Sequence, residues 1–118
     1  MMLIAALALQ VSLSGLPLDP TEGCSDKDGT IALSSCYSER ADAWQKRLDA
    51  AYPTTLRFVK GPQRDALRRA QSAWLKYRNS TCEFYALTPG SIRYIQGAYC
   101  MLDLNRSRAL ELEEFILP

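Results

Sequence analysis

Residues 67–82, LRRAQSAWLKYRNSTC, decide the fold of this chain. Side chains at steps of three and four residues share one face of a helix. In this stretch that face carries Leu67, Ala70, Gln71, Trp74, Tyr77, Arg78 and Thr81. No Gly or Pro interrupts the stretch, and Ala, Leu, Arg, Lys and Gln are good helix formers. The stretch therefore predicts one long helix.

The predicted helix carries polar side chains inside its apolar face, because Gln71 and Arg78 flank Trp74 one turn to either side. A buried amide or guanidinium requires hydrogen-bond partners. We therefore expect a structural polar core in which the arginines pair with carboxylates between helices, such as Asp42, Asp49 or Glu83. The alternative is a guanidinium presented to an anionic ligand, which arginine can hold bidentately.

A first helix is expected upstream, with Asp28 or Thr30 as its N-cap. Its inner face is the set Leu33, Tyr37, Ala41, Trp44, Leu48, Ala51 and Thr55. Pro53 removes one backbone donor and disfavours helical geometry at Tyr52, so it predicts a kink or a short break there. Gly61 and Pro62 then end one helix and begin the next, and this short link makes the two helices antiparallel neighbours.

A third helix is expected over residues 98–115, after a turn at residues 88–91 and a segment at 92–97 that Gly97 weakens as a helix. Its expected inner face is Ala98, Met101, Leu102, Asn105, Arg108, Ala109, Leu112 and Ile116. Asn105 and Arg108 repeat the mixture of polar and apolar residues and join the predicted polar core. The fold class is all-α, a small three-helix up-down-up bundle that forms a single domain over residues 16–118.

Composition excludes several functions. A chain of 118 residues suits one domain, and a net charge of +1 gives no basic surface for nucleic acid. The chain has no His, the commonest general base, and Glu113 and Glu114 point apart because adjacent helical residues do not face each other. We therefore expect neither an enzyme nor a catalytic residue, and no cofactor or metal.

Residues 1–15 contain an apolar run of the length typical of a signal peptide and too short for a spanning helix. We expect cleavage near Ser14 or Gly15, which leaves no stable membrane span; the alternative is a retained anchor helix. The residues before Cys24 do not match a lipidation signal. The mature protein is expected in the periplasm or secreted.

Four cysteines, Cys24, Cys36, Cys82 and Cys100, indicate a disulfide framework in a small exported domain. Their spacing contains no C-x2-C pair, which argues against zinc. All four gather at one end of the predicted bundle, so the sequence leaves their pairing open. We favour Cys24–Cys36 and Cys82–Cys100, which close the shorter loops.

The pattern A-Q-x-x-W-x-x-x-R-x-x-x-C at residues 70–82 resembles the LprI-like lysozyme-inhibitor domain family. The spacing of Cys24 and Cys36, the motif at residues 48–52, Cys100 and the Arg108-x-x-x-Leu112 pair continue the resemblance, which covers residues 24–112. It implies a small helical envelope or secreted domain, with lysozyme inhibition as the activity after which the family is named.

The chain departs from the family pattern at four positions. Gln45 stands where the family usually has Asp, and Asp49 where it has Asn. Asn79 replaces a frequent Asp, and Asn105 a frequent Thr. If the usual acids serve Arg78, this chain must supply another, such as Asp49 or Asp42.

The connection at residues 88–99 is the expected binding segment. It is predicted as a loop held rigid by a Cys82–Cys100 bridge, with Ser91, Arg93, Tyr94 and Tyr99 as partner-binding residues. Tyr and Arg are enriched at interface hot spots, and a lysozyme cleft contains two catalytic carboxylates. The alternative is a solvated connector whose aromatic rings pack into the core.

The sequence therefore predicts an exported, non-enzymatic binding protein whose partner is a protein. The family resemblance implies that this partner is a lysozyme, occluded at its cleft. The alternative is an envelope structural or interaction module that binds a different protein. The oligomeric state is not predicted.

Overall fold

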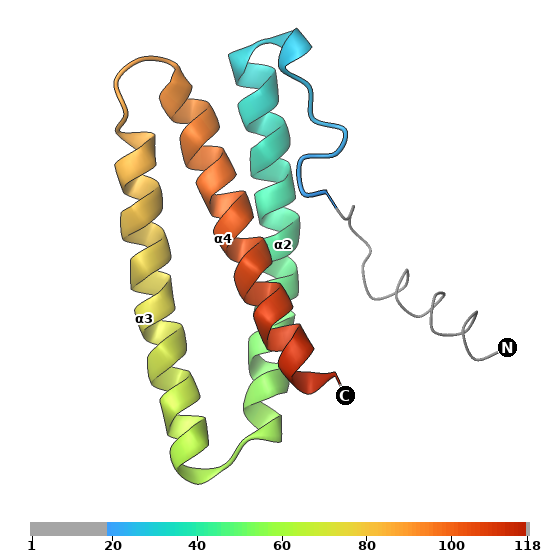
Figure 1. Ribbon diagram of the computed structural model, residues 1–118, viewed down its shortest axis with the longest axis vertical. Coiled ribbons are helices and arrows are strands. Elements are labelled where there is room, and N and C mark those ends of the chain that lie inside the picture. Colours follow the sequence, from blue (N-terminus) through green and yellow to red (C-terminus); the bar gives the residue numbers. More distant parts are fainter. Residues whose placement is uncertain (1–18, 118) are drawn as a thin grey trace, which may run out of the picture.

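The computed structural model describes residues 19–117, so the expected signal peptide at residues 1–15 lies outside the described residues. A short 3-10 turn, η1 (Asp26–Asp28), precedes three helices: α2 (Thr30–Phe58), α3 (Gly61–Ala86) and α4 (Ile92–Ile116). In Figure 1, α3 runs antiparallel to both α2 and α4, and residues 19–117 contain no strand. The predicted all-α, up-down-up fold is confirmed. None of the helices in this part of the chain is both long and apolar enough to cross a membrane.

The three helices lie side by side in one layer, with α4 between α2 and α3 (Figure 1). α4 packs along α2 and also contacts α3, whereas α2 and α3 hardly touch. The expectation that α2 and α3 would be packing neighbours is therefore wrong, although they are antiparallel.

The apolar core lies between α2 and α4. It consists of Ala41, Trp44, Leu48, Ala51, Leu102, Ala109 and Leu112. These residues all belong to the inner faces predicted for the first and third helices. The spacing of apolar residues in the first and third predicted helices therefore predicted the main helix–helix contact correctly.

α3 contributes much less apolar surface. Its buried residues are Gln71, Arg78 and Cys82, while Leu67 and Trp74 are partly buried against the core. Ala70 and Tyr77, which were expected on its inner face, are exposed. α3 is thus attached to α4 through polar side chains and a disulfide more than through a shared apolar core.

The beginning of α2 and its passage through Pro53 differ from expectation. The N-cap is Gly29, with no side-chain cap, in place of Asp28 or Thr30. α2 continues as helix through Pro53 without a break. The Thr54 and Thr55 hydroxyls just beyond Pro53 each donate to a helix carbonyl four residues earlier, at 2.9 Å.

α4 begins at Ile92, six residues before the predicted start, so residues 92–97 are helix and the predicted loop is wrong. Gly97 lies inside this helix. A Cβ added at Gly97 would meet the Ala86 Cβ at 3.2 Å and its Cα at 3.4 Å. Gly97 therefore lets α3 and α4 approach closely near their connecting turn, which outweighs the weaker helix propensity of glycine.

The two disulfides are Cys24–Cys36 and Cys82–Cys100, with Cα–Cα distances of 5.7 Å and 5.4 Å. The first ties the segment before α2 to the first turns of that helix, and the second ties the end of α3 to α4. Both favoured pairings are confirmed, and no described cysteine is free.

Candidate functional site

Exposed apolar side chains gather around the turn between α3 and α4. We call this region the tip and define it as Phe84, Leu87 and residues 91–94. Phe84 and Leu87 are 71% and 72% exposed, and Ile92 and Tyr94 are about half exposed. Large apolar side chains grouped on a protruding turn are typical of a surface that contacts another molecule.

Arg93 and Tyr94 form a pre-oriented pair at the tip. The Arg93 Nη2 donates to the Tyr94 hydroxyl at 2.8 Å, and the guanidinium lies 4.7 Å from the centre of the Tyr94 ring. Ser91 is exposed beside them, in the N-cap position of α4. The pair holds a cation and an aromatic ring together in one defined arrangement.

Tyr99, the fourth residue predicted for partner binding, is not at the tip. Its ring packs edge-on against the Tyr37 ring of α2, with 5.7 Å between centres. Its exposed part lines a separate cleft between α3 and α4. The structure therefore divides the predicted residues between two neighbouring surfaces.

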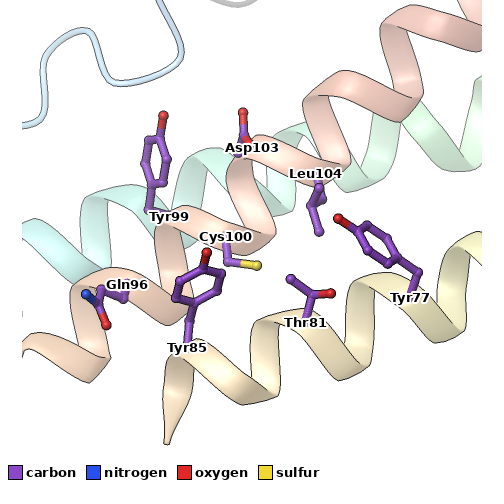
Figure 2. A pocket seen from close by; sticks show the side chains of 8 residues that line it. All are labelled: Tyr77, Thr81, Tyr85, Gln96, Tyr99, Cys100, Asp103 and Leu104. Atoms are coloured by element: carbon purple, nitrogen blue, oxygen red, sulfur yellow. The ribbon is translucent and has the colours of Figure 1, made fainter. Parts of the chain in front are cut away.

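That cleft, which we call the tyrosine cleft, has a volume of about 280 Å³. Figure 2 shows its side chains projecting from α3 and α4. The lining residues are Tyr77, Thr81, Tyr85, Gln96, Tyr99, Cys100, Asp103 and Leu104. The sequence does not predict this cleft, because its periodicity places Tyr77 in the core and Gly97 favours a loop over residues 92–97. The available signal was the four-residue repeat of Tyr77, Thr81 and Tyr85 on α3.

The predicted polar core connects all three helices around Arg78, which is only 9% exposed. Its Nη1 donates to Gln45 Oε1 of α2 at 2.6 Å and to Asn105 Oδ1 of α4 at 2.9 Å. Its Nε and Nη2 both donate to Asn79 Oδ1, at 3.1 Å and 3.0 Å. The direct partners of Arg78 are thus three neutral amides, and the expectation of a carboxylate partner is wrong.

The Asp49 carboxylate is linked to Arg78 through one of these amides, Gln45. Gln45 Nε2 donates to Asp49 Oδ1 at 2.8 Å, while Gln45 Oε1 accepts from Arg78. Burial lowers the pKa of Arg78, and the Asp49 carboxylate acts in the opposite direction. Asn105 completes the network by donating from Nδ2 to the Ala41 carbonyl of α2 at 3.1 Å.

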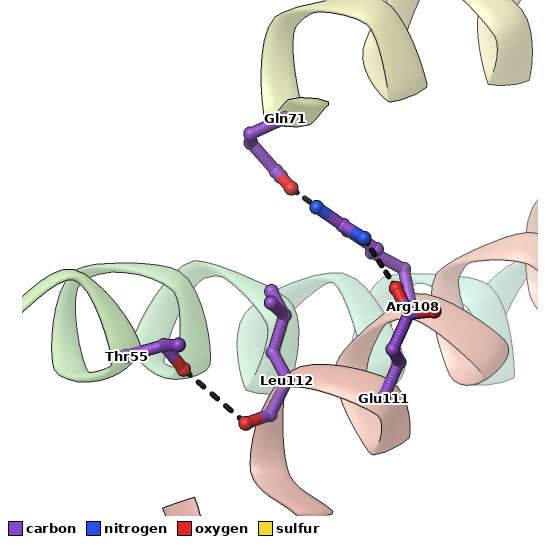
Figure 3. A network of polar contacts seen from close by, with 5 residues as sticks. All are labelled: Thr55, Gln71, Arg108, Glu111 and Leu112. Atoms are coloured by element: carbon purple, nitrogen blue, oxygen red, sulfur yellow. Dashed lines mark hydrogen bonds and ion pairs between the residues drawn. The ribbon is translucent and has the colours of Figure 1, made fainter. Parts of the chain in front are cut away.

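A second arginine, Arg108, links α4 to α3 and also lies near the Trp74 ring. Its Nε donates to Gln71 Oε1 at 2.9 Å, and its Nη1 pairs with Glu111 (Figure 3). The Trp74 ring centre lies 5.3 Å from the Arg78 guanidinium carbon and 6.0 Å from that of Arg108. The five residues predicted as a structural polar core, Gln71, Trp74, Arg78, Asn105 and Arg108, do lie together between the helices. Their partners within the chain support the structural interpretation over ligand binding.

Within residues 19–117, no group of three or more Cys, Asp or Glu side chains is placed to hold a metal ion. The Glu113 carboxylate, at the contact between α2 and α4, is engaged in an ion pair with Arg47. The residues predicted for partner binding lie on two surfaces, the tip and the tyrosine cleft.

Comparison with known proteins agrees with this architecture. Residues 22–112 match the family described as "Lysozyme inhibitor LprI". The chain is 34% identical over 104 residues to an uncharacterized protein of Rhizobium meliloti (strain 1021), covering 79% of this chain and 69% of that protein. No solved structure matches. The family match spans both disulfides, the polar core and the tip, and the chain therefore belongs to the LprI lysozyme-inhibitor family.

Proposed function

We propose that this protein is exported and inhibits a lysozyme by placing the tip in the lysozyme cleft. Membership of the LprI family supports a lysozyme as the partner. The observation that carries the choice of surface is the Arg93–Tyr94 pair, presented among exposed apolar side chains.

The chemistry of the tip fits the cleft of a glycoside hydrolase. Two carboxylates flank the scissile bond in such a cleft, and a guanidinium can donate charge-assisted hydrogen bonds to both. Arg93 would supply that charge, and Tyr94 would pack where a saccharide ring normally lies. Phe84, Leu87 and Ile92 would bury apolar surface around them, which excludes water from the ionic contact.

The tip also has little freedom to lose on binding. The Cys82–Cys100 bond joins α3 and α4 close to the turn. The turn itself runs directly from the end of α3 to the start of α4. A surface that is already ordered gives up less entropy when it binds. This rigidity favours insertion of the tip as a preformed wedge.

Export is supported by the covalent structure. All four cysteines of the chain are joined in disulfides, which persist in oxidising compartments. Residues 1–15 would provide the signal peptide for that route. The mature protein would then act in the periplasm or outside the cell, where lysozymes attack the wall.

The test is calorimetric titration of a lysozyme with the mature protein, together with a lysozyme lysis assay. Arg93→Ala should weaken binding at least tenfold, since losing a buried charged contact commonly costs about 2–5 kcal/mol. Arg57→Ala and Lys60→Ala are matched controls, because both side chains are exposed at the opposite end of the molecule and should leave affinity unchanged.

Two results would contradict the proposal in different ways. Equal affinity for all three variants would exclude the tip as the contact surface. A parent protein that binds no lysozyme would exclude the partner, and would favour an envelope module that binds a different protein.

A further inference from the structure

We infer that the tyrosine cleft binds a short neutral oligosaccharide. This inference does not depend on lysozyme inhibition, because it concerns a different surface and a different ligand. The cleft lies on the side of the α3–α4 pair, below the tip, and its lining comes from α3 and α4 alone.

The first argument is the set of polar groups left without partners. Within residues 19–117, the Asp103 carboxylate and the hydroxyls of Tyr77, Tyr85 and Tyr99 make no hydrogen bond or ion pair. A carboxylate accepts from hydroxyl groups, and a phenol both donates and accepts. The cleft therefore offers several hydrogen-bonding groups that a polyhydroxylated ligand would satisfy.

The second argument is that the surface of the cleft between these polar groups is aromatic and apolar. Tyr77, Tyr85 and Tyr99 are 56%, 40% and 42% exposed, and Leu104 and Cys100 provide the rest of the apolar lining. Aromatic rings with one polar edge suit ligands that are themselves apolar on one face and polar at the edges. A pyranose ring has this character, with C–H groups on its faces and hydroxyls around its rim.

Two of the rings are held in place before any ligand arrives. Tyr99 packs edge-on against Tyr37, and Tyr85 packs edge-on against Phe84 with 5.2 Å between centres. Their orientation is therefore fixed by neighbours that lie outside the cleft. A pre-oriented aromatic wall lowers the entropy cost of binding a weakly held ligand.

Charge and shape exclude other ligands. The lining contains one carboxylate and no Lys or Arg, so an anion such as a phosphate would find no cation there. Tyr77, Thr81 and Tyr85 repeat once per turn, which spreads them over about 12 Å of α3. A single ammonium ion must lie within about 6 Å of each ring that binds it, so a compact cation would not use the full row. An elongated ligand of two or three sugar rings fits this spacing.

The experiment is an NMR titration of the mature protein with the trimer of N-acetylglucosamine, and separately with maltotriose. We expect the largest shifts at residues 77–85 and 96–104 with at least one of the two sugars. Tyr85→Leu and Asp103→Asn should each weaken binding roughly fivefold, as expected for losing one aromatic or polar contact. Arg57→Ala near the end of α2 and Glu114→Gln near the end of α4 are the controls and should leave the affinity unchanged, because both residues are exposed and neither lines the cleft.

The titration contains no lysozyme, so its result is separate from that of the inhibition assay. Absence of shifts with both sugars, or shifts confined to residues outside the cleft, would overturn the inference. A third titration with tetramethylammonium chloride tests the remaining alternative. Tighter binding of this cation than of either sugar, lost in Asp103→Asn, would also overturn it.

Discussion

The residues around Arg78 explain how this chain accommodates its departures from the family pattern. Three of the four departures, Gln45, Asn79 and Asn105, are the direct hydrogen-bond partners of Arg78. The fourth, Asp49, is the carboxylate that Gln45 contacts. The Gln45 amide thus lies between the Arg78 guanidinium and the Asp49 carboxylate, which is one helical turn further along α2. All four residues therefore belong to one hydrogen-bonded network around Arg78.

Returning an acid to this network should stabilise the protein. In Asn79→Asp, a carboxylate would face the Nε and Nη2 of Arg78, and we expect the free energy of unfolding to rise by about 0.5–1 kcal/mol at pH 7. Arg78 would lower the pKa of the new Asp in the folded state. The gain is therefore complete above the ordinary Asp pKa of about 3.9 and is lost as the pH falls through the lower folded value.

Urea unfolding at pH 7 and at acid pH measures this effect. Ser80→Asp is the control, because it adds the same charge on the exposed neighbouring residue, which is not a partner of Arg78. A gain in Asn79→Asp that persists after the carboxylate is protonated would show that the Arg78 pair is not its cause.

Removing the guanidinium should have the opposite effect. Arg78→Met leaves the buried Asn105 Oδ1 without its donor, and an unsatisfied buried acceptor costs about 1–3 kcal/mol. We expect the free energy of unfolding to fall by that amount. Arg68→Met on the same helix should change it by less than about 0.5 kcal/mol, since the Arg68 side chain is 52% exposed.

The same variants test the structural interpretation of the polar core. Folded Arg78→Met should bind its partner as the parent protein does, measured by calorimetry at a temperature where both are native. A folded variant that has lost binding would assign Arg78 a direct role in recognition.

At the scale of helices, periodicity predicted the contact between α2 and α4 and most of its core. At the link between α2 and α3, Pro62 lies in the first turn of α3 as predicted, and Gly61 has the predicted positive φ, +56°. Gly61 does not close the first helix, however, because α2 ends at Phe58 and Gly61 is the first residue of α3. Prediction from the sequence was wrong where contacts between helices outweigh the local conformational preference of a residue. Gly97 suggested a loop because glycine weakens helices, yet its role is to admit Ala86 of the neighbouring helix.

The partners of Arg78 were also beyond the reach of sequence reasoning. Charge complementarity pointed to Asp42, Asp49 or Glu83, whereas the helix register places amides against the guanidinium. The tyrosine cleft was missed for a related reason. The α4 residues that line the cleft can be placed on one helix face only when residues 92–97 are known to be helical.

The close approach at Gly97 gives a prediction for the helix pair. Gly97→Leu would press a side chain against Ala86, and overpacking of this kind costs about 1–3 kcal/mol. Urea unfolding measures the loss. Ser107→Leu, at an exposed position of the same helix, should stay within about 0.5 kcal/mol of the parent. Equal effects of the two substitutions would mean that α3 and α4 can separate without cost.

At the scale of the whole molecule, the flat arrangement leaves α3 with weak apolar attachment. α2 and α4 share the core, while α3 relies on Arg78, Arg108, the contact at Gly97 and the Cys82–Cys100 bond. A bridge that closes a loop of this length contributes roughly 3 kcal/mol in the chain-entropy model.

Replacing the second disulfide should therefore loosen one helix selectively. In a Cys82→Ala, Cys100→Ala double variant, we expect amide hydrogen exchange to accelerate in α3 more than in α2 or α4, because only α3 loses its main anchor. Hydrogen–deuterium exchange read by mass spectrometry measures this. The matched control, Cys24→Ala with Cys36→Ala, should affect residues 19–36 and leave α3 protected. Uniform acceleration across all three helices would show that α3 is integral to the cooperative core.

The Cys82–Cys100 bridge also bears on when the proposed site would form. The bond joins α3 to α4 beside the turn that carries the tip, while the buried core cluster consists of residues from α2 and α4. On the export route proposed above, this bond would form only in an oxidising compartment. The bond would then act as a latch that ties the final ordering of the proposed binding surface to the compartment in which that surface would work.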